Sequence, residues 1–224
     1  MVKILVGLLG DKRNTYLPHE SAEKALMQIA SALEGVTIRY EWLPTKTATT
    51  EQLSACDCIW AGSGPYLDEE NALLVIKYAR ENKIPTIGTC SGFKYMVVEY
   101  AKHVFKADDP YKYIGLNSNC TKDYKDLAIT LKPGCSLIAV FSSDCISETS
   151  HCNFEIDDNV VSKAAIAFEF CGVAEDGRTV LIRLPKHPFF VASLFLPQLK
   201  EDSKLVQAWL QTTIALKQNR ELIG

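Results

Sequence analysis

The sequence predicts one α/β domain with a doubly wound, mostly parallel sheet, helices on both faces and a small antiparallel excursion. In the first half of the chain, buried-strand patterns alternate with amphipathic helix patterns, which is typical of parallel sheets. Glycine-rich turns follow two of these strands, where open α/β sheets keep their ligand sites. In the second half, short strand patterns follow one another directly, which indicates antiparallel pairing. The chain has 224 residues and no repeat or clear linker, so we expect a single domain over 1–224.

The first half supplies four strands and four helices. Apolar or alternating runs predict strands over 2–9, 36–43, 58–61 and 84–88. Apolar residues at helical spacing predict a helix from Pro18, a long helix from Asp68 to Asn82, and another from Ser91 to Val104. A short helical turn is expected from Glu51.

The second half reads as a series of strands closed by a helix. The strands are expected over 128–131, 137–141, 153–156, 164–171, 179–184 and 190–195. The final helix is expected from Asp202 to Leu222, because its apolar residues again recur at helical spacing.

Composition excludes several classes of function. A net charge of −3 and a pI near 5.8 give no basis for binding nucleic acid. The first apolar run is too short for a signal peptide, and no run approaches a membrane span, so we expect a cytoplasmic protein. No nucleotide fingerprint is present, and we expect no cofactor. The eight cysteines include no C-x-x-C pair, so we expect neither disulfides nor a metal site.

The most informative stretch is Gly88-Thr89-Cys90-Ser91-Gly92. It follows an apolar strand and opens a helix, which is the pattern of a nucleophile elbow with cysteine at its centre. The glycines allow the sharp turn, and the helix N-terminus favours a thiolate. The alternative is an ordinary tight turn that holds one of the eight cysteines.

Four stretches together resemble the class I glutamine amidotransferases, and most of all the amidotransferase domain of the CTP synthases. They are the approach to the turn at 78–85, the turn at 88–92, the following helix at 98–104, and the segment at 187–193. The resemblance extends over nearly the whole chain and implies a flavodoxin-like fold. No stretch resembles the synthetase half of those enzymes, so we expect that this chain alone does not make CTP.

The resemblance implies a mechanism in which a cysteine thiolate attacks the side-chain amide of glutamine. A histidine activates the cysteine, a glutamate orients the histidine, and backbone N–H groups hold the oxyanion. On this sequence Cys90 would be the nucleophile. The oxyanion donors would come from Ser91 and from the glycine-rich turn at Gly62 and Ser63.

Two departures from the family pattern alter that expectation. The family's last catalytic strand ends in F-H-P-E, whereas this chain has Phe195-Leu196-Pro197-Gln198. Leu196 therefore stands at the histidine position and Gln198 at the glutamate position. The arginine that helps hold the substrate's α-carboxylate is replaced by Asn153, which removes a charge-assisted hydrogen bond worth roughly 1.5–3 kcal/mol.

A replacement base would have to come from the four histidines. We place His151 first, because it lies in the segment that faces the substrate in the family, although an exposed loop histidine is the alternative. We expect His103 to interact with its helix C-terminus, His187 to be structural and His19 to be on the surface.

Three hypotheses for function follow. In the first, the protein is a cysteine-dependent hydrolase of an amide or γ-glutamyl-like compound, working without the histidine and glutamate. In the second, it is an inactive relative that binds a metabolite or a protein. In the third, which Leu196 disfavours, it supplies ammonia to a separate synthetase. The expected partner is a small molecule, with a homo-oligomer or a separate partner protein left open.

Overall fold

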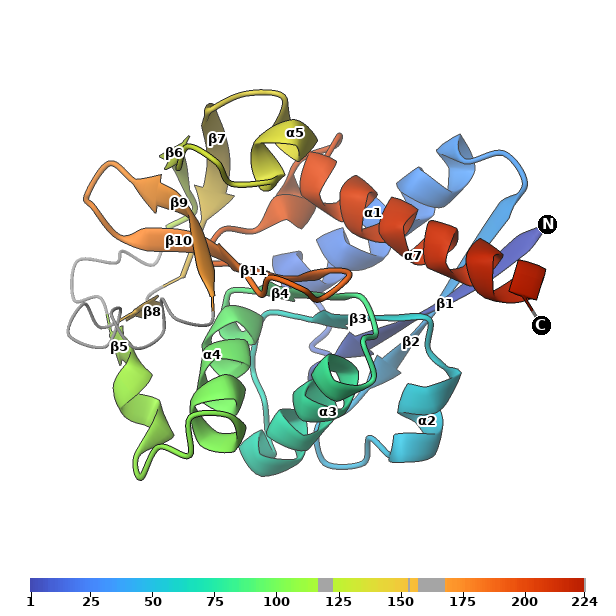
Figure 1. Cartoon of the computed structure of the whole chain (residues 1–224), viewed down its shortest axis with the longest axis horizontal. Helices are drawn as coiled ribbons and strands as arrows, with labels where there is room; N and C mark the ends of the chain where they lie inside the picture. The colour runs from blue at the N-terminus through green and yellow to red at the C-terminus, as the bar shows by residue number, and fades with distance from the viewer. Residues whose placement is uncertain (117–122, 153, 157–167, 224) are drawn as a thin grey trace.

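The main sheet lies at the centre of the molecule (Figure 1). The computed structural model describes residues 1–116, 123–152, 154–156 and 168–223. Within these residues one sheet has the strand order β2-β1-β3-β4-β11-β10-β9-β6-β7. Its strands are β1 Val2–Leu9, β2 Val36–Leu43, β3 Cys58–Ala61, β4 Thr86–Thr89, β6 Lys125–Leu131, β7 Cys145–Ser150, β9 Glu169–Ala174, β10 Thr179–Arg183 and β11 Phe190–Ser193. A second, two-stranded sheet pairs β5 (Ile114–Leu116) with β8 (Phe154–Ile156).

The main sheet divides into a parallel part and an antiparallel part. Strands β2, β1, β3, β4 and β11 are paired in parallel. From β11 outward, β10, β9, β6 and β7 are paired antiparallel. The predicted fold class is confirmed. The carboxyl ends of β3, β4 and β11 meet at one edge, because parallel strands end on the same side.

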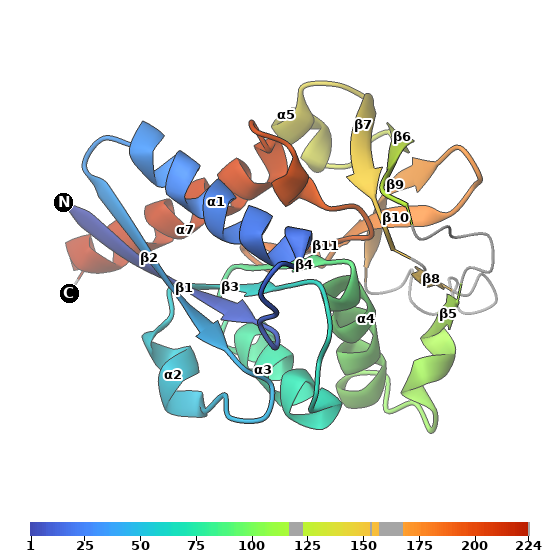
Figure 2. The ribbon, with the colours of Figure 1, turned by 180° about the vertical axis from the view of Figure 1, so that it is seen from behind.

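Helices cover both faces of the parallel part (Figures 1 and 2). Helices α1 (Leu17–Ala32) and α7 (Lys204–Ile223) lie on one face. Helices α2 (Thr50–Ala55), α3 (Glu69–Glu81) and α4 (Ser91–His103) lie on the other. The remaining helical pieces are α5 (Leu137–Phe141) and the 3₁₀ turns η1 (Pro110–Tyr113) and η2 (Pro197–Leu199). Among the described helices, none combines the length and apolar character needed to cross a bilayer.

Local sequence explains where the helices of the first half begin. The Asp68 side chain accepts a hydrogen bond from Asn71 N at 2.9 Å and starts α3. Thr49 and Gln52 form a reciprocal capping box at the start of α2. Pro18 stands in the first turn of α1, where a missing N–H costs nothing. These signals lie within a few residues of each start and are visible in the sequence.

The predicted strand over 137–141 is wrong, because this segment forms helix α5. A short apolar run fits either structure, and period alone does not separate them. In the structure Leu137 and Phe141 are both buried and four residues apart, which places them on one helix face. This helix packs against α7, and tertiary packing decides its conformation.

Strand β7 is not expected from the sequence, because Cys145-Ile-Ser-Glu-Thr-Ser150 is mostly polar. It pairs with β6 at the edge of the sheet, where both faces need not be apolar. The predicted strand over 164–171 lies partly outside the described residues, and its described part belongs to β9. Of the predicted strand over 153–156, residue 153 also lies outside them, and the rest is β8.

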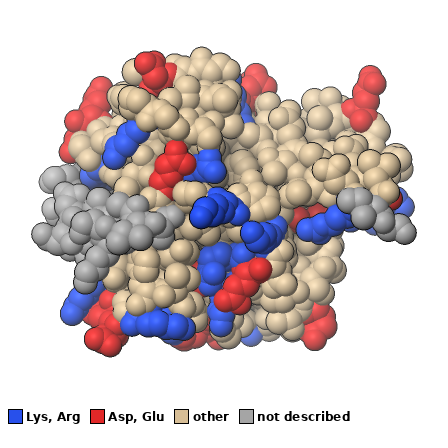
Figure 3. Space-filling model, in the orientation of Figure 1, with Lys and Arg blue, Asp and Glu red and all other residues tan. Residues whose placement is uncertain are grey.

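The core continues directly beneath the end of β4. Trp60 and Trp209 are fully buried and meet edge to face, with ring centroids 5.6 Å apart. Trp60 Nε1 donates to Thr89 Oγ1 at 3.1 Å, which fixes the residue before Cys90 from below. On the face shown in Figure 3, acidic and basic side chains are interspersed.

Candidate active site

The site is organised by the turn between β4 and α4. Cys90 is the N-cap of α4 and has φ +52° and ψ −105°, a conformation that L residues rarely adopt. Its N–H donates to Ser193 O at 3.0 Å, so the turn is tied to the end of β11. Strained non-glycine residues of this kind occur where surrounding structure holds them, often at active sites.

The glycines on both sides of Cys90 are required by close packing. A Cβ at Gly92 would lie 1.9 Å from Ala61 O, and a Cβ at Gly88 would lie 2.2 Å from Met96 Sδ. Gly92 N also donates to Gly62 O at 3.1 Å, which joins the elbow to the glycine-rich turn after β3. The pattern G-x-C-x-G therefore brings the two turns together at the carboxyl edge of the sheet.

Local hydrogen bonds favour the thiolate of Cys90. The hydrogen bond from the Cys152 thiol lowers the pKa of Cys90 most, and the backbone N–H and hydroxyl of Ser91 lower it further. Burial opposes them by disfavouring the charged form, and the net shift is downward. The Cys90 side chain is partly exposed, whereas Cys152 is buried. Reactive cysteines are typically partly exposed, and their surroundings stabilise the thiolate.

Three tyrosines lie in the electrostatic neighbourhood of Cys90. Burial raises the pKa of Tyr16 to about 12, and the negative charge of Cys90 adds to that rise. Burial also raises the pKa of Tyr66 and of Tyr124, with Cys90 contributing in both cases. All three phenols therefore remain protonated at neutral pH, and the Tyr66 hydroxyl donates to Gly62 O at 3.1 Å.

His151 lies beside this group. Its ring stacks on Tyr124 with centroids 4.5 Å apart, and its Nδ1 is buried with no partner among the described residues. In the described part of the chain, no hydrogen bond joins His151 to Cys90. The residue that contacts Cys90 from this segment is the next one, Cys152.

The glycine-rich turn after β3 offers a different set of groups. Gly62 N donates to Leu9 O at 3.0 Å, so this N–H is already satisfied within the sheet edge. Ser63 is fully buried, and its hydroxyl has no partner among the described residues. A buried polar atom without a partner needs an explanation, and a bound ligand or water is the usual one.

The expectation that His19 lies on the surface is wrong. Its side chain is 1% exposed, its Nδ1 accepts from Arg13 N at 3.1 Å, and its Nε2 therefore donates to Ser63 O at 2.9 Å. Burial lowers the pKa of His19 and favours this neutral tautomer. His19 thus supports the glycine-rich turn from α1. The sequence does not reveal this role, because His19 and Ser63 are 44 residues apart.

Leu196 and Gln198, which the sequence resemblance aligns with the family's histidine and glutamate, are buried. Leu196 is 1% exposed, lies three residues beyond Ser193, and donates its N–H to Thr149 O at 2.8 Å. The Gln198 amide donates to Pro18 O at 3.4 Å, while its Oε1 has no partner among the described residues. Neither side chain can act as a base near neutral pH. Asn153 lies outside the described residues.

Sequence reasoning does not single out Cys152 or the tyrosines. Cys152 looks like one of the core cysteines, although its position next to His151 in the substrate-facing segment is a usable signal. Tyr16, Tyr66 and Tyr124 come from separate segments, and only the fold brings them to Cys90.

A parallel sheet whose central strand ends in a cysteine elbow, beside a glycine-rich turn, is the architecture of the class I amidotransferases. Residues 19–194 match the family model described as "Glutamine amidotransferase class-I", and the chain belongs to this family. The match ends before Leu196, so it does not extend to Leu196 or Gln198.

Curated relatives agree with this assignment. CTP synthase from Desulfitobacterium hafniense is 32% identical over 171 residues, which are 65% of this chain and 32% of the relative. CTP synthase from Halalkalibacterium halodurans is 30% identical over 226 residues, covering 88% and 41%. The chain thus spans between about a third and two fifths of these relatives.

Among solved structures, the glutaminase domain of Trypanosoma brucei CTPS with bound acivicin is similar, with a TM-score of 0.78 and 14% identity. The match covers 94% of this chain and 93% of that one. A glutamine amidotransferase from Thermotoga maritima has a TM-score of 0.60 and 9% identity, covering 97% of this chain and 85% of that one. At these identities the structures show a shared fold.

Proposed function

We propose that the protein is a cysteine-dependent hydrolase of an amide or γ-glutamyl-like compound and does not use a histidine–glutamate pair. The observation that carries this proposal is the conformation and setting of Cys90. Its strained backbone presents the sulfur at a helix N-terminus, and Cys152 and Ser91 stabilise the thiolate. Because these hydrogen bonds lower the pKa of the Cys90 thiol, we propose that no separate base generates the nucleophile.

In this proposal the Cys90 thiolate attacks the carbonyl carbon and forms a thioester as the amine leaves. The leaving amine takes its proton from water or from His151, whose Nδ1 has no partner among the described residues. Water then hydrolyses the thioester, releasing the acid and restoring the thiol. The candidate donors to the oxyanion are the backbone N–H of Ser91 and the backbone N–H of Ser63 in the glycine-rich turn.

The replacement of the family's arginine by Asn153 argues against free glutamine as the preferred substrate. An unpaired α-carboxylate would lose a charge-assisted hydrogen bond, so a compound blocked or neutral at that position fits better. The physiological substrate is therefore proposed as a small γ-glutamyl-like amide. A homo-oligomer or a separate partner protein is compatible with this proposal.

The test compares wild type with Cys90→Ala on γ-glutamyl p-nitroanilide whose α-carboxylate is blocked as an amide, with glutamine and asparagine as comparison compounds that carry a free α-carboxylate. We expect wild type to release p-nitroaniline, Cys90→Ala to release none, and the control Cys145→Ser to match wild type. Iodoacetamide should alkylate Cys90 faster than the exposed Cys145 at pH 7. Equal alkylation of the two cysteines, together with no turnover, would contradict the proposal.

The second candidate function is binding without catalysis, and the burial of Leu196 and Gln198 favours it. In that case a ligand should raise the melting temperature of wild type and Cys90→Ala by the same amount, with no product. Screening amino acids and nucleotides by thermal shift, followed by product analysis, separates the two candidates.

A further inference from the structure

A cluster of possible metal ligands lies away from the elbow. Cys135, Glu169 and Cys171 each offer one ligand atom, and these atoms all lie within 4.8 Å of one another. Cys135 and Cys171 are 4% and 0% exposed. Strand β9, which carries two of the three residues, is separated from β4 by β11 and β10 in the sheet. The cluster therefore has no part in the proposed hydrolase site.

Local structure holds the three side chains together. Glu169 and Cys171 are two residues apart on β9, so they share one face of the strand. Lys132 N donates to Cys171 O at 2.8 Å, which fastens the turn leading to Cys135 against the same strand. Cys135 N closes that turn by donating to Lys132 O at 3.1 Å.

The turn also directs a backbone donor at one sulfur. Leu137 N donates to Cys135 Sγ at 3.4 Å. The Cys135 and Cys171 thiols are themselves in hydrogen-bond contact. Two thiolates bound to one zinc ion at about 2.3 Å in tetrahedral geometry would stand roughly 3.8 Å apart, which suits sulfur atoms already in contact.

A neighbouring arginine completes the charge balance. Arg183 Nε lies 3.3 Å from Glu169 Oε2 and leaves the other carboxylate oxygen available. Two thiolates and one carboxylate carry three negative charges, which a divalent cation and Arg183 would together neutralise. An outer partner that orients a ligating carboxylate is a common feature of protein metal sites.

We propose that Cys135, Glu169 and Cys171 bind a zinc ion. Thiolate ligands select zinc over magnesium or calcium, and three protein ligands leave a fourth position for water or a small ligand. Because Cys135 lies far from the other two residues in the sequence, no C-x-x-C motif indicates this site.

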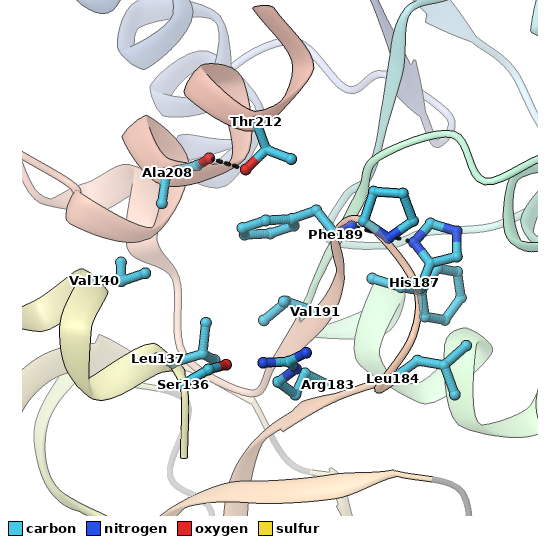
Figure 4. A pocket seen from close by; sticks show the side chains of 12 residues that line it. Ser136, Leu137, Val140, Arg183, Leu184, His187, Phe189, Val191, Ala208 and Thr212 are labelled. Carbon is cyan, nitrogen blue, oxygen red and sulfur yellow. Dashed lines mark hydrogen bonds between the residues drawn. The ribbon is translucent and has the colours of Figure 1, made fainter. Parts of the chain in front are cut away.

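A cavity is lined by neighbours of this cluster. It has a volume of about 170 Å³, and Ser136, Leu137 and Arg183 are part of its lining. Figure 4 shows Ser136, Leu137 and Arg183 gathered at one end of the cavity. Two of these residues follow Cys135 directly, and the third pairs with Glu169. A metal site needs an entry path, and we infer that this cavity supplies it.

The test uses the full chain, reduced and stripped of metal with a chelator, then titrated with Co²⁺ and Zn²⁺. We expect about one Co²⁺ per chain with the near-ultraviolet charge-transfer band of cobalt–thiolate bonds, and displacement of the band by Zn²⁺. Zinc should also raise the melting temperature. Cys135→Ser and Cys171→Ser should lose the band, and Glu169→Gln, which alters a direct ligand, should weaken binding by at least about 10-fold.

Two matched controls locate the site. Cys145→Ser removes an exposed cysteine, and Cys90→Ala removes the elbow thiol, so both should bind like wild type. A cobalt band unchanged in both Cys135→Ser and Glu169→Gln would overturn the proposal. So would a Cys135–Cys171 disulfide that resists reduction and prevents zinc binding. Because Glu169→Gln is nearly isosteric, it keeps the test valid if a cysteine variant fails to fold.

Discussion

The Cys152 thiol donates a hydrogen bond to the sulfur of Cys90, and this contact lowers the pKa of Cys90 more than any other interaction does. In the class I amidotransferase mechanism, a histidine activates the cysteine nucleophile. The sequence resemblance assigns that histidine position to Leu196, whose side chain cannot exchange a proton. The Cys152 thiol thus contacts the sulfur of Cys90, the atom that corresponds to the histidine-activated sulfur in the family.

Replacing Cys152 with Ala should raise the pKa of Cys90, because the thiolate loses its main hydrogen-bond donor. We expect the alkylation rate of Cys90 at pH 7 to fall by roughly three- to tenfold, and to recover at higher pH. The measurement is the rate of iodoacetamide labelling between pH 5 and 10, followed by peptide mass spectrometry. Cys145→Ser serves as the control, and an unchanged profile in Cys152→Ala would exclude this contact as the cause.

Restoring the family's residues with Leu196→His and Gln198→Glu should restore glutaminase activity only weakly. The substrate's α-carboxylate would still lack its arginine, a loss of roughly 1.5–3 kcal/mol. Adding Asn153→Arg to the double variant should raise the rate of ammonia release from glutamine by about 10- to 150-fold. The assay is coupled detection of ammonia with Cys90→Ala in each background. Ordinary glutaminase rates in the double variant would show that the arginine position is unimportant.

Gly92→Ala should destabilise the fold by about 3 kcal/mol or more, because its Cβ would lie 1.9 Å from a backbone oxygen, Ala61 O. The free energy of unfolding from urea titration gives the comparison. Gly115→Ala is the matched control, since its new Cβ would meet a side-chain atom of Glu155 at 3.4 Å. Equal stability of the two variants would mean that the elbow and β3 are packed less closely than described.

Glu148 should make stability fall as the pH rises. Burial raises its pKa from 4.5 to about 7, against the opposing effect of Lys200. Below pH 4.5 the carboxyl is protonated in both states, whereas between 4.5 and 7 the unfolded chain releases the proton first. The contribution of Glu148 to the free energy of unfolding, on the order of 3 kcal/mol, is therefore lost as the pH rises through about 7.

The pH dependence can be assigned to Glu148 by substitution. Glu148→Gln keeps the shape and cannot ionise, so its free energy of unfolding should decline less between pH 4.5 and 8 than that of wild type. Glu175→Gln, at an exposed turn, should retain the full slope. Parallel slopes for wild type and Glu148→Gln would rule out Glu148 as the source.

Features encoded by neighbouring residues could be read from the sequence. The elbow is one, because Gly88 and Gly92 flank Cys90 and the strand and helix patterns adjoin it. The helix from Asp68 is another, since its cap and apolar stripe are local. The secondary-structure prediction failed where the local sequence fits a strand and a helix equally well. At Leu137–Phe141, packing against α7 selects the helix.

The sequence by itself determined the parallel sheet, the position of Cys90 at a strand-to-helix turn, and the absence of an ionisable base at Leu196 and Gln198. These depend on residue type and short-range pattern. Only the tertiary structure placed Cys152 against Cys90, buried His19 beneath Ser63, and gathered Cys135 with Glu169 and Cys171. Such contacts join segments far apart in the chain, and they form because strand pairing and core packing fix which segments meet.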